Sequence, residues 1–310
     1  MAQISPKLFS KDLAVEIFPA NVFYTKGFKD IAAGDVTSVD IPIAGNIGTA
    51  KKGHPTLPLT IKQRSDSVLN YALTQLYCDP VFVPREEDIV LNYSKQLDLT
   101  RAMGESISSL AADLTANIWG VTGSTTSGRV VMTTGTARAT DLVGASGNRK
   151  AITKADFLNV RKAFMKQNIP LNGIIAVVTP QQYTDILGIA EFVDFEKTGV
   201  MTKLAEGVVG RILGFDIMVR WNETLGSIGL HYDATGANKK DLASVDATDA
   251  PAALFFHPRY VRYAEAFPET IINRKPAGYL GGTIIEAVVR YGASHSRTDQ
   301  RGVVVLVEAT

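Results

Sequence analysis

The fold is decided by ADFLNVRKAFMKQN (155–168), GIIAVVTPQQYTDIL (173–187) and GVVGRILGFDIMVRW (207–221). The first stretch has the apolar spacing of an amphipathic helix, and the second predicts a buried strand followed by a helix start. The third places a glycine-punctuated turn, Gly210 to Gly214, before an apolar strand, Phe215 to Val219. None of them carries a group of reactive side chains. They are suited to packing, so the sequence points to assembly rather than to catalysis.

Size and charge limit the class of protein. A chain of 310 residues can form one large domain or two moderate ones with a sizeable core. The 32 Lys and Arg residues nearly balance the 31 Asp and Glu residues, which gives a net charge of +1. Proteins whose main task is to grip nucleic acid carry an excess of cations. The balance therefore argues against that class.

Cysteine content and hydropathy indicate where the protein is made. Cys78 is the only cysteine, which excludes an intrachain disulfide and a zinc site with four cysteine ligands. The N-terminal segment is interrupted by charges and does not resemble a signal peptide. No window approaches the roughly 18 apolar residues of a membrane span. These features predict a soluble protein that is made and kept in the cytoplasm.

The first part of the chain predicts two extended features. Residues 1–33 have short apolar clusters that cannot form a core alone and must lie on another surface; they include Phe18, Phe23 and Tyr24. From Asp35 to about Tyr77 the chain alternates as in strands, with Val39 and Ile41 on the apolar side. Glycine and proline interrupt this pattern around a basic tip at Lys51 and Lys52. The pattern predicts a long hairpin, which is marginal in water unless it rests against a neighbour.

A long helix and a set of strands are predicted next. Residues 85–119 have apolar residues spaced for one face, with Pro84 before the start and Gly104 as the weak point. Unbroken, this helix would be roughly 50 Å long and would serve as a spine. Thr153 with Asp156, and Thr179 with Pro180, predict helix starts. Strands are predicted at 130–132, 252–256, 260–265, 283–291 and 302–307.

Candidate reactive groups do not form a recognisable site. GSTTSGRV (123–130) has the glycine spacing of a phosphate-binding loop, but Arg129 and Val130 replace its lysine and hydroxyl. The scattered histidines lack metal-ligand spacing, and Cys78 lacks a catalytic signature. The carboxylates near 191–196 are best explained as solvated charges. The sequence therefore predicts no catalytic, cofactor-binding or metal site. An α/β enzyme with an unrecognised site stays open as an alternative.

The order of elements resembles the major capsid proteins of tailed bacteriophages, which share the Hong Kong 97-type fold. The matching segments are GDVTSVDIP (34–42), SLAADLTANIW (109–119), RKAF (161–164), VTPQQY (178–183), VGRILGF (209–215), LFFHP (254–258) and YGASHSRTDQRGVVVL (291–306). The resemblance implies an α+β fold with an N-terminal arm (1–33), an extended loop or E-loop (34–84), and a P-domain spine helix with following strands (85–150). It also implies an A-domain (151–255) and C-terminal P-domain strands (256–310).

The function implied by this resemblance is structural. The chain would form pentamers and hexamers of an icosahedral phage head around double-stranded DNA, in a virion assembled in the host cytoplasm. Expected partners are copies of the chain, scaffolding and portal proteins, and decoration proteins; no cofactor and no membrane are expected. Because the arm starts almost at Met1, a separate scaffolding protein or a processed form is expected. An encapsulin-like compartment shell is the nearest alternative. The predicted contact residues are Phe18, Phe23, Tyr24, Val39, Ile41, Lys51, Lys52, Gly210 and Gly214.

Overall fold

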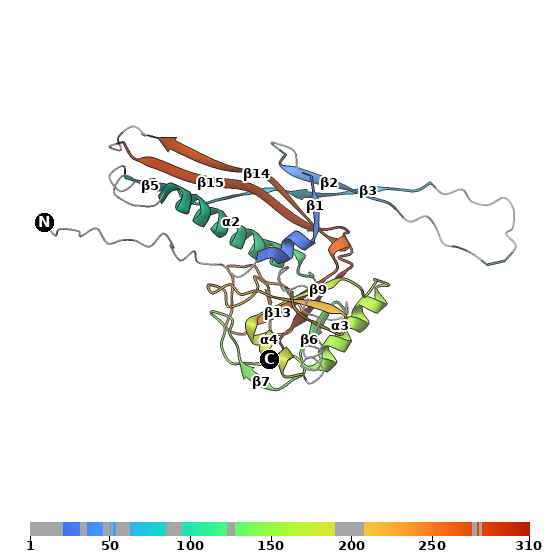
Figure 1. Ribbon diagram of the computed structural model, residues 1–310. Coiled ribbons are helices and arrows are strands. Elements are labelled where there is room, and N and C mark those ends of the chain that lie inside the picture. The colour runs from blue at the N-terminus through green and yellow to red at the C-terminus, as the bar shows by residue number, and fades with distance from the viewer. Residues whose placement is uncertain are drawn as a thin grey trace.

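The computed structural model describes residues 21–31, 36–45, 50, 52–53, 63–84, 95–122, 128–189, 208–274, 278 and 281–310. Two predicted contact residues, Phe18 and Lys51, lie outside these ranges, as do residues 123–127 of the glycine-rich segment. Figure 1 shows an elongated upper lobe, from which a hairpin projects, and a compact lower lobe.

Helices and strands are mixed along the described chain. The helices are η1 (a 3-10 helix, Asn21–Lys26), α2 (Lys95–Trp119), α3 (Lys154–Lys166), α4 (Pro180–Leu187) and η4 (a 3-10 helix, Pro258–Tyr260). The strands are β1 (Phe28–Asp30), β2 (Ser38–Ile43), β3 (Ser67–Ala72), β4 (Thr74–Tyr77), β5 (Val81–Val83), β6 (Val130–Met132), β7 (Ala137–Ala139), β8 (Asn148–Lys150), β9 (Ile174–Val178), β10 (Val208–Ile212), β11 (Phe215–Val219), β12 (His231–Tyr232), β13 (Ala250–Phe256), β14 (Val261–Arg274), β15 (Thr283–His295) and β16 (Val303–Val307). This confirms the predicted α+β class.

The lower lobe is built on a seven-stranded sheet. Its order is β10–β11–β9–β13–β16–β6, with β12 beside β13. Strand β9 pairs parallel with β11 and antiparallel with β13, and all five of its residues are buried. One face packs against Phe157 and Phe164 of α3, and the other belongs to the cluster that contains Trp119 at the end of α2. Because both faces are covered, β9 is a continuous apolar run rather than an alternating one.

The upper lobe is built on a five-stranded sheet along which α2 lies (Figure 1). Its order is β1–β14–β15–β4, and β5 also pairs with β15. The long strands β14 and β15 have 14 and 13 residues. The predicted alternation of β15 is confirmed, because one face is buried and the other is half-buried. Within the predicted stretch 283–291 the buried residues are Ile285, Ala287, Val289 and Tyr291.

The predicted hairpin is confirmed at its base. Strands β2 and β3 pair antiparallel, from Ser38 opposite Ala72 to Ile43 opposite Ser67. Ile41 and Tyr71 pack with Ala264 and Ala266 of β14, which fixes the base on the upper lobe. Beyond that base the pair extends away from both lobes (Figure 1). The hairpin therefore presents its two strands to the surroundings rather than to its own chain.

Both predicted helix starts are confirmed. Thr179 precedes α4 and its hydroxyl accepts a hydrogen bond from the backbone N–H of Gln182 at 3.2 Å. The Gln182 side chain accepts in return from the N–H of Thr179 at 3.0 Å. At α3, the carboxylate of Asp156 accepts from the N–H of Thr153 at 2.9 Å. These contacts satisfy backbone donors that a helix start leaves unpaired.

Several predicted boundaries differ from the structure. The described helix α2 begins at Lys95 and ends, as predicted, at Trp119, while residues 85–94 lie outside the described ranges. Gly104 does not interrupt it. Strand β14 continues to Arg274, well beyond the predicted end at 265, because it pairs with β15 along nearly its whole length. Pairing along a neighbouring strand is a tertiary effect that the local pattern does not carry.

The strand pairing also crosses the predicted domain ranges. Strand β16 (303–307), grouped with the C-terminal P-domain strands, pairs with β13 and β6 in the seven-stranded sheet. Strand β6 (130–132), grouped with the spine helix, lies at an edge of the same sheet. The ranges remain a division proposed from the sequence.

Candidate assembly surfaces

The end of the predicted arm is anchored on its own chain. The rings of Phe23 and Trp119 pack edge-to-face at 6.1 Å, and Tyr24 packs in the same way on Tyr263 and Tyr291. Phe23 is 1% exposed, so its ring is already enclosed by this chain. Gly27 lies so close to Trp119 that a β-carbon there would be 2.8 Å from the indole ring. A subunit contact at Tyr24, which is half-buried, stays a prediction.

A buried ion pair joins the spine helix to the lower lobe. Arg220, which follows β11, donates from Nη1 to Oδ1 of Asp113 on α2 at 2.6 Å. The same guanidinium donates to the carbonyls of Ile228 and of Ser109, the latter at 3.1 Å. Asn222 donates to the second oxygen of Asp113 at 2.6 Å. A buried charge pair of this kind needs all of these hydrogen bonds to offset its desolvation.

Sequence reasoning missed this pair. Arg220 and Asp113 are 107 positions apart and neither belongs to a recognisable motif. The available signal was an arginine directly after an apolar strand and an aspartate within the apolar part of a predicted helix. Both types are almost never fully buried unless paired.

The base of the hairpin is held by a second polar cluster. Arg262 on β14 donates to Asp30 on β1 at 2.6 Å, and the hydroxyl of Tyr71 on β3 donates to the same carboxylate at 2.8 Å. Burial, together with this hydrogen bond to Asp30, raises the pKa of Tyr71, so its hydroxyl keeps the proton. The cluster joins three strands where the hairpin leaves the upper lobe. It therefore fixes the direction in which the hairpin projects.

The structure places the hairpin residues on different surfaces. Ile41 is buried against β14, and Val39 is partly buried beside it. Lys52, which the sequence places in the predicted basic tip, is exposed. Val39 and Ile41 thus support the hairpin base, whereas the side chain of Lys52 is exposed to solvent. Contact of these residues with another subunit stays a prediction.

The turn of the lower lobe is shorter than predicted: it starts three residues later, at Leu213, and ends at Gly214 as expected. Gly210 lies within β10, not in the turn, because β10 pairs with β11 up to Ile212 opposite Phe215. The turn consists of Leu213 and Gly214, both with positive φ, 49° and 94°. Two successive residues of positive φ match the tight hairpin turns that suit the twist of paired strands. Gly214 is confirmed as a turn residue.

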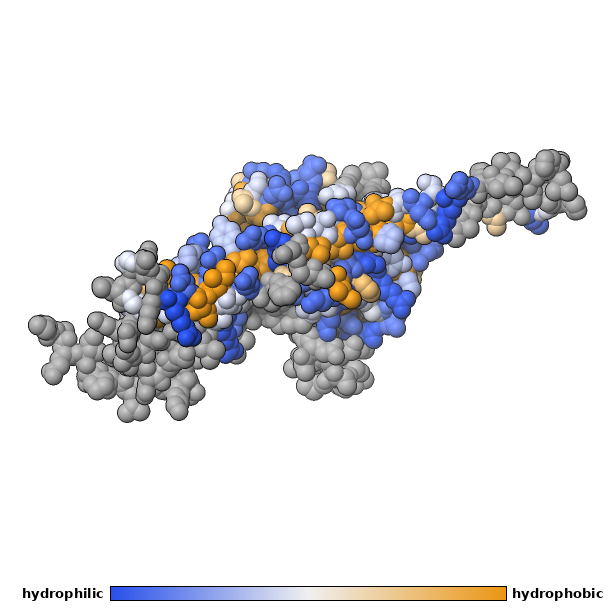
Figure 2. Space-filling view, turned by 90° about the horizontal axis from the view of Figure 1, so that it is seen from above, coloured by the Kyte–Doolittle hydropathy of each residue, from blue (hydrophilic) through white to orange (hydrophobic). Residues whose placement is uncertain are grey.

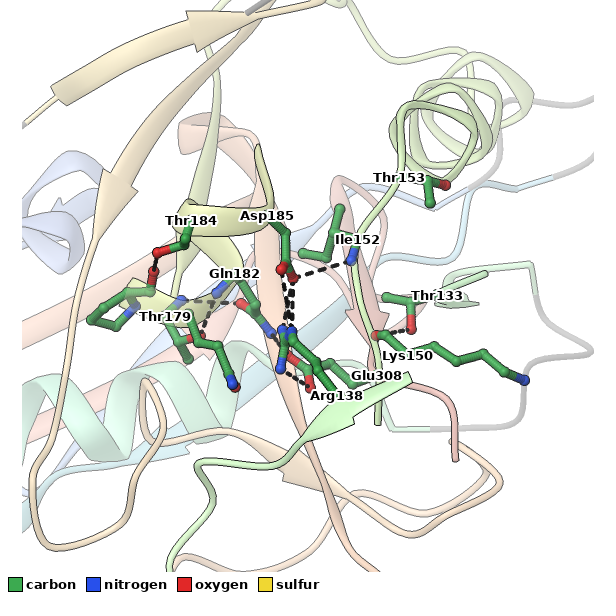
Figure 3. A network of polar contacts seen from close by, with 12 residues as sticks. Thr133, Arg138, Lys150, Ile152, Thr153, Thr179, Gln182, Thr184, Asp185 and Glu308 are labelled. Atoms are coloured by element: carbon green, nitrogen blue, oxygen red, sulfur yellow. Dashed lines mark hydrogen bonds and ion pairs between the residues drawn. The ribbon is translucent and has the colours of Figure 1, made fainter. Parts of the chain in front are cut away.

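Figure 3 shows a network of polar contacts around Arg138 in the lower lobe. Arg138 donates to Asp185 of α4 at 2.7 Å and to Glu308 at 2.9 Å, and Gln182 donates to Glu308 at 3.0 Å. Burial raises the pKa of Glu308, and the charge of Arg138 partly opposes that rise. Burial lowers the pKa of Arg138, but the two carboxylates outweigh it and the net pKa is raised. The network joins β7, α4 and the end of β16.

Charged groups also gather at the C-terminal end of α2. Lys239 donates to the carbonyls of Asn117 at 2.7 Å and Gly120 at 3.4 Å, as a cation should at a helix C-terminus. Burial lowers the pKa of Lys239. Burial also lowers the pKa of His295 to about 4, with Lys239 and Arg129 adding to the effect. His295 is therefore neutral at physiological pH.

The described ranges hold no group of three or more His, Cys, Asp or Glu side chains placed to bind a metal ion. Within the same ranges, no helix is both long and apolar enough to cross a membrane. His231 and His257 make local hydrogen bonds, to the carbonyl of Ser244 and from the N–H of Arg259. Cys78 is a free thiol that contacts the carbonyl of Met103.

Comparison with known proteins gives a clear result for the fold. No protein-family model matches the sequence, and no curated protein matches it either. Solved structures do match. The capsid of Ralstonia phage GP4 aligns over 99% of this chain and 96% of its own, with a TM-score of 0.67 and 14% identity. The capsid of cyanophage P-SCSP1u aligns over 98% and 92%, with a TM-score of 0.63 and 16% identity.

A chain of Mycobacterium phage Che8 aligns over 99% of this chain and 98% of its own, with a TM-score of 0.59 and 16% identity. Each alignment spans both lobes and the projecting hairpin rather than one shared sheet. The fold of this chain is therefore the Hong Kong 97-type fold of phage capsid proteins, as the order of its sequence elements implied.

Proposed function

We propose that the chain is a major capsid subunit, which assembles into pentamers and hexamers of an icosahedral phage head. The observation that carries this proposal is the projecting β2–β3 hairpin, whose described strands pack on the rest of their own chain near the base. A two-stranded hairpin is marginal in water when it stands alone. It becomes stable when another copy of the chain lies against it.

A second surface supports the same proposal. The face of the five-stranded sheet that points away from α2 carries exposed apolar side chains. They include Tyr77 opposite Val288, Phe82 opposite Ile284, and Ile271 opposite Glu286. Tyr77 is 62% exposed and Ile271 is 44% exposed. Figure 2 views the molecule from this side and shows hydrophobic residues running along it among hydrophilic ones. Gathered apolar side chains of this kind mark an interaction site.

Contacts between the same two surfaces on successive copies are heterologous, so they close into rings. Stable contacts bury about 1,600 Å² each. In this proposal the shell encloses double-stranded DNA without gripping it, which suits a net charge of +1. Scaffolding, portal and decoration proteins are the further partners, and the virion is the final location. The chain performs no catalysis.

The test is electron microscopy of the purified chain with light scattering. Closed shells, tubes or five- and six-membered rings are expected. A monomer or dimer that persists at high concentration and with crowding agents would overturn the proposal. Enclosed DNA would distinguish a phage head from a compartment that encloses an enzyme.

The role of the hairpin is tested by deletion of residues 45–56. Soluble subunits with an unchanged melting temperature, but without shells, are expected. A variant in which a Gly-Ser segment of equal length replaces residues 45–56 keeps the length of the loop but changes its side chains. It therefore tests whether assembly depends on the length or on the side chains. Normal shells from the deletion variant would show that the hairpin has no role in assembly.

A further inference from the structure

The exposed side of α3 is basic and apolar. Leu158, Lys162 and Met165 follow one another at helical spacing, and Lys166 lies beside them. Leu158 is 46% exposed and Met165 is 51% exposed, whereas the opposite side of α3 is buried in the core. The acidic residue of this helix, Asp156, is buried and bonded to Thr153 and Thr134. We call Leu158, Lys162, Met165 and Lys166 the α3 face.

Another surface of the lower lobe has the complementary character. It is formed by three loops: 140–147, 222–227 and 241–248. The loops are joined by hydrogen bonds from the N–H of Val143 to the carbonyl of Leu225, at 3.1 Å, and from the N–H of Ser146 to the carbonyl of Ala247, at 2.9 Å. Val143 is 52% exposed. The exposed carboxylates around it are Asp141, Glu223, Asp241 and Asp246.

The cations that flank these loops in the sequence are already engaged. Lys240 pairs with Asp246 at 2.6 Å. The guanidinium of Arg149 is buried and donates to backbone carbonyls, including that of Asp249 at 2.7 Å. The loops therefore present an apolar centre with a net negative rim. We call Val143, Asp141, Glu223, Asp241 and Asp246 the Val143 face.

The two faces lie on different sides of the lower lobe. Helix α3 packs on the face of the seven-stranded sheet that carries Phe255 and Val304. The segment from Ile228 to Tyr232, which the loops flank, packs on the other face, with Leu254 and Val305. Figure 1 shows α3 and these loops on opposite flanks of the lobe. A contact between two different surfaces of one molecule is heterologous and joins successive copies head to tail.

We propose that the α3 face of one subunit docks on the Val143 face of the next copy around the ring. This inference rests on the proposed function and names the contact within it. Leu158 and Met165 cover Val143, and the two lysines meet the carboxylate rim. Exposed charge pairs add little affinity individually. Their effect is to steer association and to select the correct partner and register.

The test is a charge exchange read by sedimentation velocity and electron microscopy. K162E/K166E and D141K/E223K should each lower the assembled fraction about tenfold, because like charges then meet at the contact. The combination of all four substitutions should restore assembly, because it rebuilds the complementarity with reversed signs. K162R/K166R, which keeps the charge, should assemble like the original chain. All four positions are exposed, so the melting temperature of each unassembled variant should change little.

Assembly of both charge-reversed variants at the original level would overturn this contact but leave the proposed function intact. Failure of the four-fold variant to recover would also overturn the pairing of the two faces. Normal rings from K162E/K166E with weaker retention of DNA would assign the α3 face to nucleic acid instead. An original chain that never forms rings or shells would overturn the proposed function itself.

Discussion

Arg220 and Asp113 form a buried ion pair, 2.6 Å between Nη1 and Oδ1, that joins the lower lobe to the C-terminal half of the spine helix. Their side chains are 1% and 7% exposed. The guanidinium carbon of Arg220 lies 5.8 Å from the centroid of the Phe23 ring, so the end of the arm also packs on this ion pair. This pair therefore fixes the relative placement of three parts of the subunit.

Removal of one partner of this pair should be costly. Asp113→Ala removes the carboxylate that the structure shows paired with the buried charge of Arg220, so we expect a loss of about 3–5 kcal/mol in the free energy of unfolding. The measurement is urea unfolding at a concentration where the chain is unassembled. Glu105→Ala is the control, because Glu105 forms an exposed pair with Arg101 on the same helix. That variant should lose about 0.3–0.5 kcal/mol. Equal losses for the two variants would contradict the role given to Asp113.

Two glycines should respond to alanine in opposite directions. Gly229 has φ of +91°, and a β-carbon there would lie 2.8 Å from Cα of Asp113. Gly229→Ala should therefore destabilise the subunit and disturb the ion pair. Gly104 is inside α2 with no neighbour within 4 Å of an added β-carbon. Gly104→Ala should stabilise the subunit by about 0.5–1 kcal/mol. The measurement is the melting temperature of each variant. A change of the same sign in both variants would contradict the packing described around Gly229 and Gly104.

His295 should make the subunit sensitive to acid. The unfolded chain binds a proton on this residue below about pH 6.5, whereas burial lowers the pKa in the folded state to about 4. The contribution of His295 to the free energy of unfolding is therefore complete above about pH 6.5 and is lost as the pH falls toward 4. Between pH 7.5 and 5 the loss is about 2 kcal/mol. His295→Phe should remove this part of the pH dependence in urea unfolding. An unchanged pH profile would show that His295 is not shielded from water.

Arg138 should matter more at high pH. Without its guanidinium, Glu308 is a buried carboxyl whose pKa, already raised by burial, rises further. A folded-state pKa above the unfolded value gives stability that is lost as the pH rises through it. Arg138→Met should therefore cost about 2 kcal/mol at pH 8 and clearly less at pH 5. When Glu308→Gln is combined with Arg138→Met, the loss of stability should become nearly equal at pH 8 and pH 5. Urea unfolding at both pH values provides the measurement, and an equal cost at both would contradict this role of Arg138.

Local patterns were sufficient for many elements. The strand Phe215–Val219, the buried strand before Thr179, and the helix starts at Thr153 and Thr179 agree with the structure. Each depends on neighbouring residues: an apolar run, a side chain that caps its own helix, or alternation along one strand. The fold class followed from the order of these elements. The paired strands of the hairpin followed from alternation interrupted by glycine and proline.

Other features depended on residues that are distant in the sequence. The pairing of β16 with β6, the length of β14, and the clusters around Asp113, Asp30 and Arg138 arise only when the chain is folded. The same holds for the α3 face and the Val143 face, whose charges gather from separate loops and one helix. The sequence by itself determined the elements and their order, because short-range sterics and hydrophobic periodicity act within a few residues. The tertiary structure decided which charges are buried, which are paired and which face outward, because burial and pairing depend on neighbours that only folding brings together.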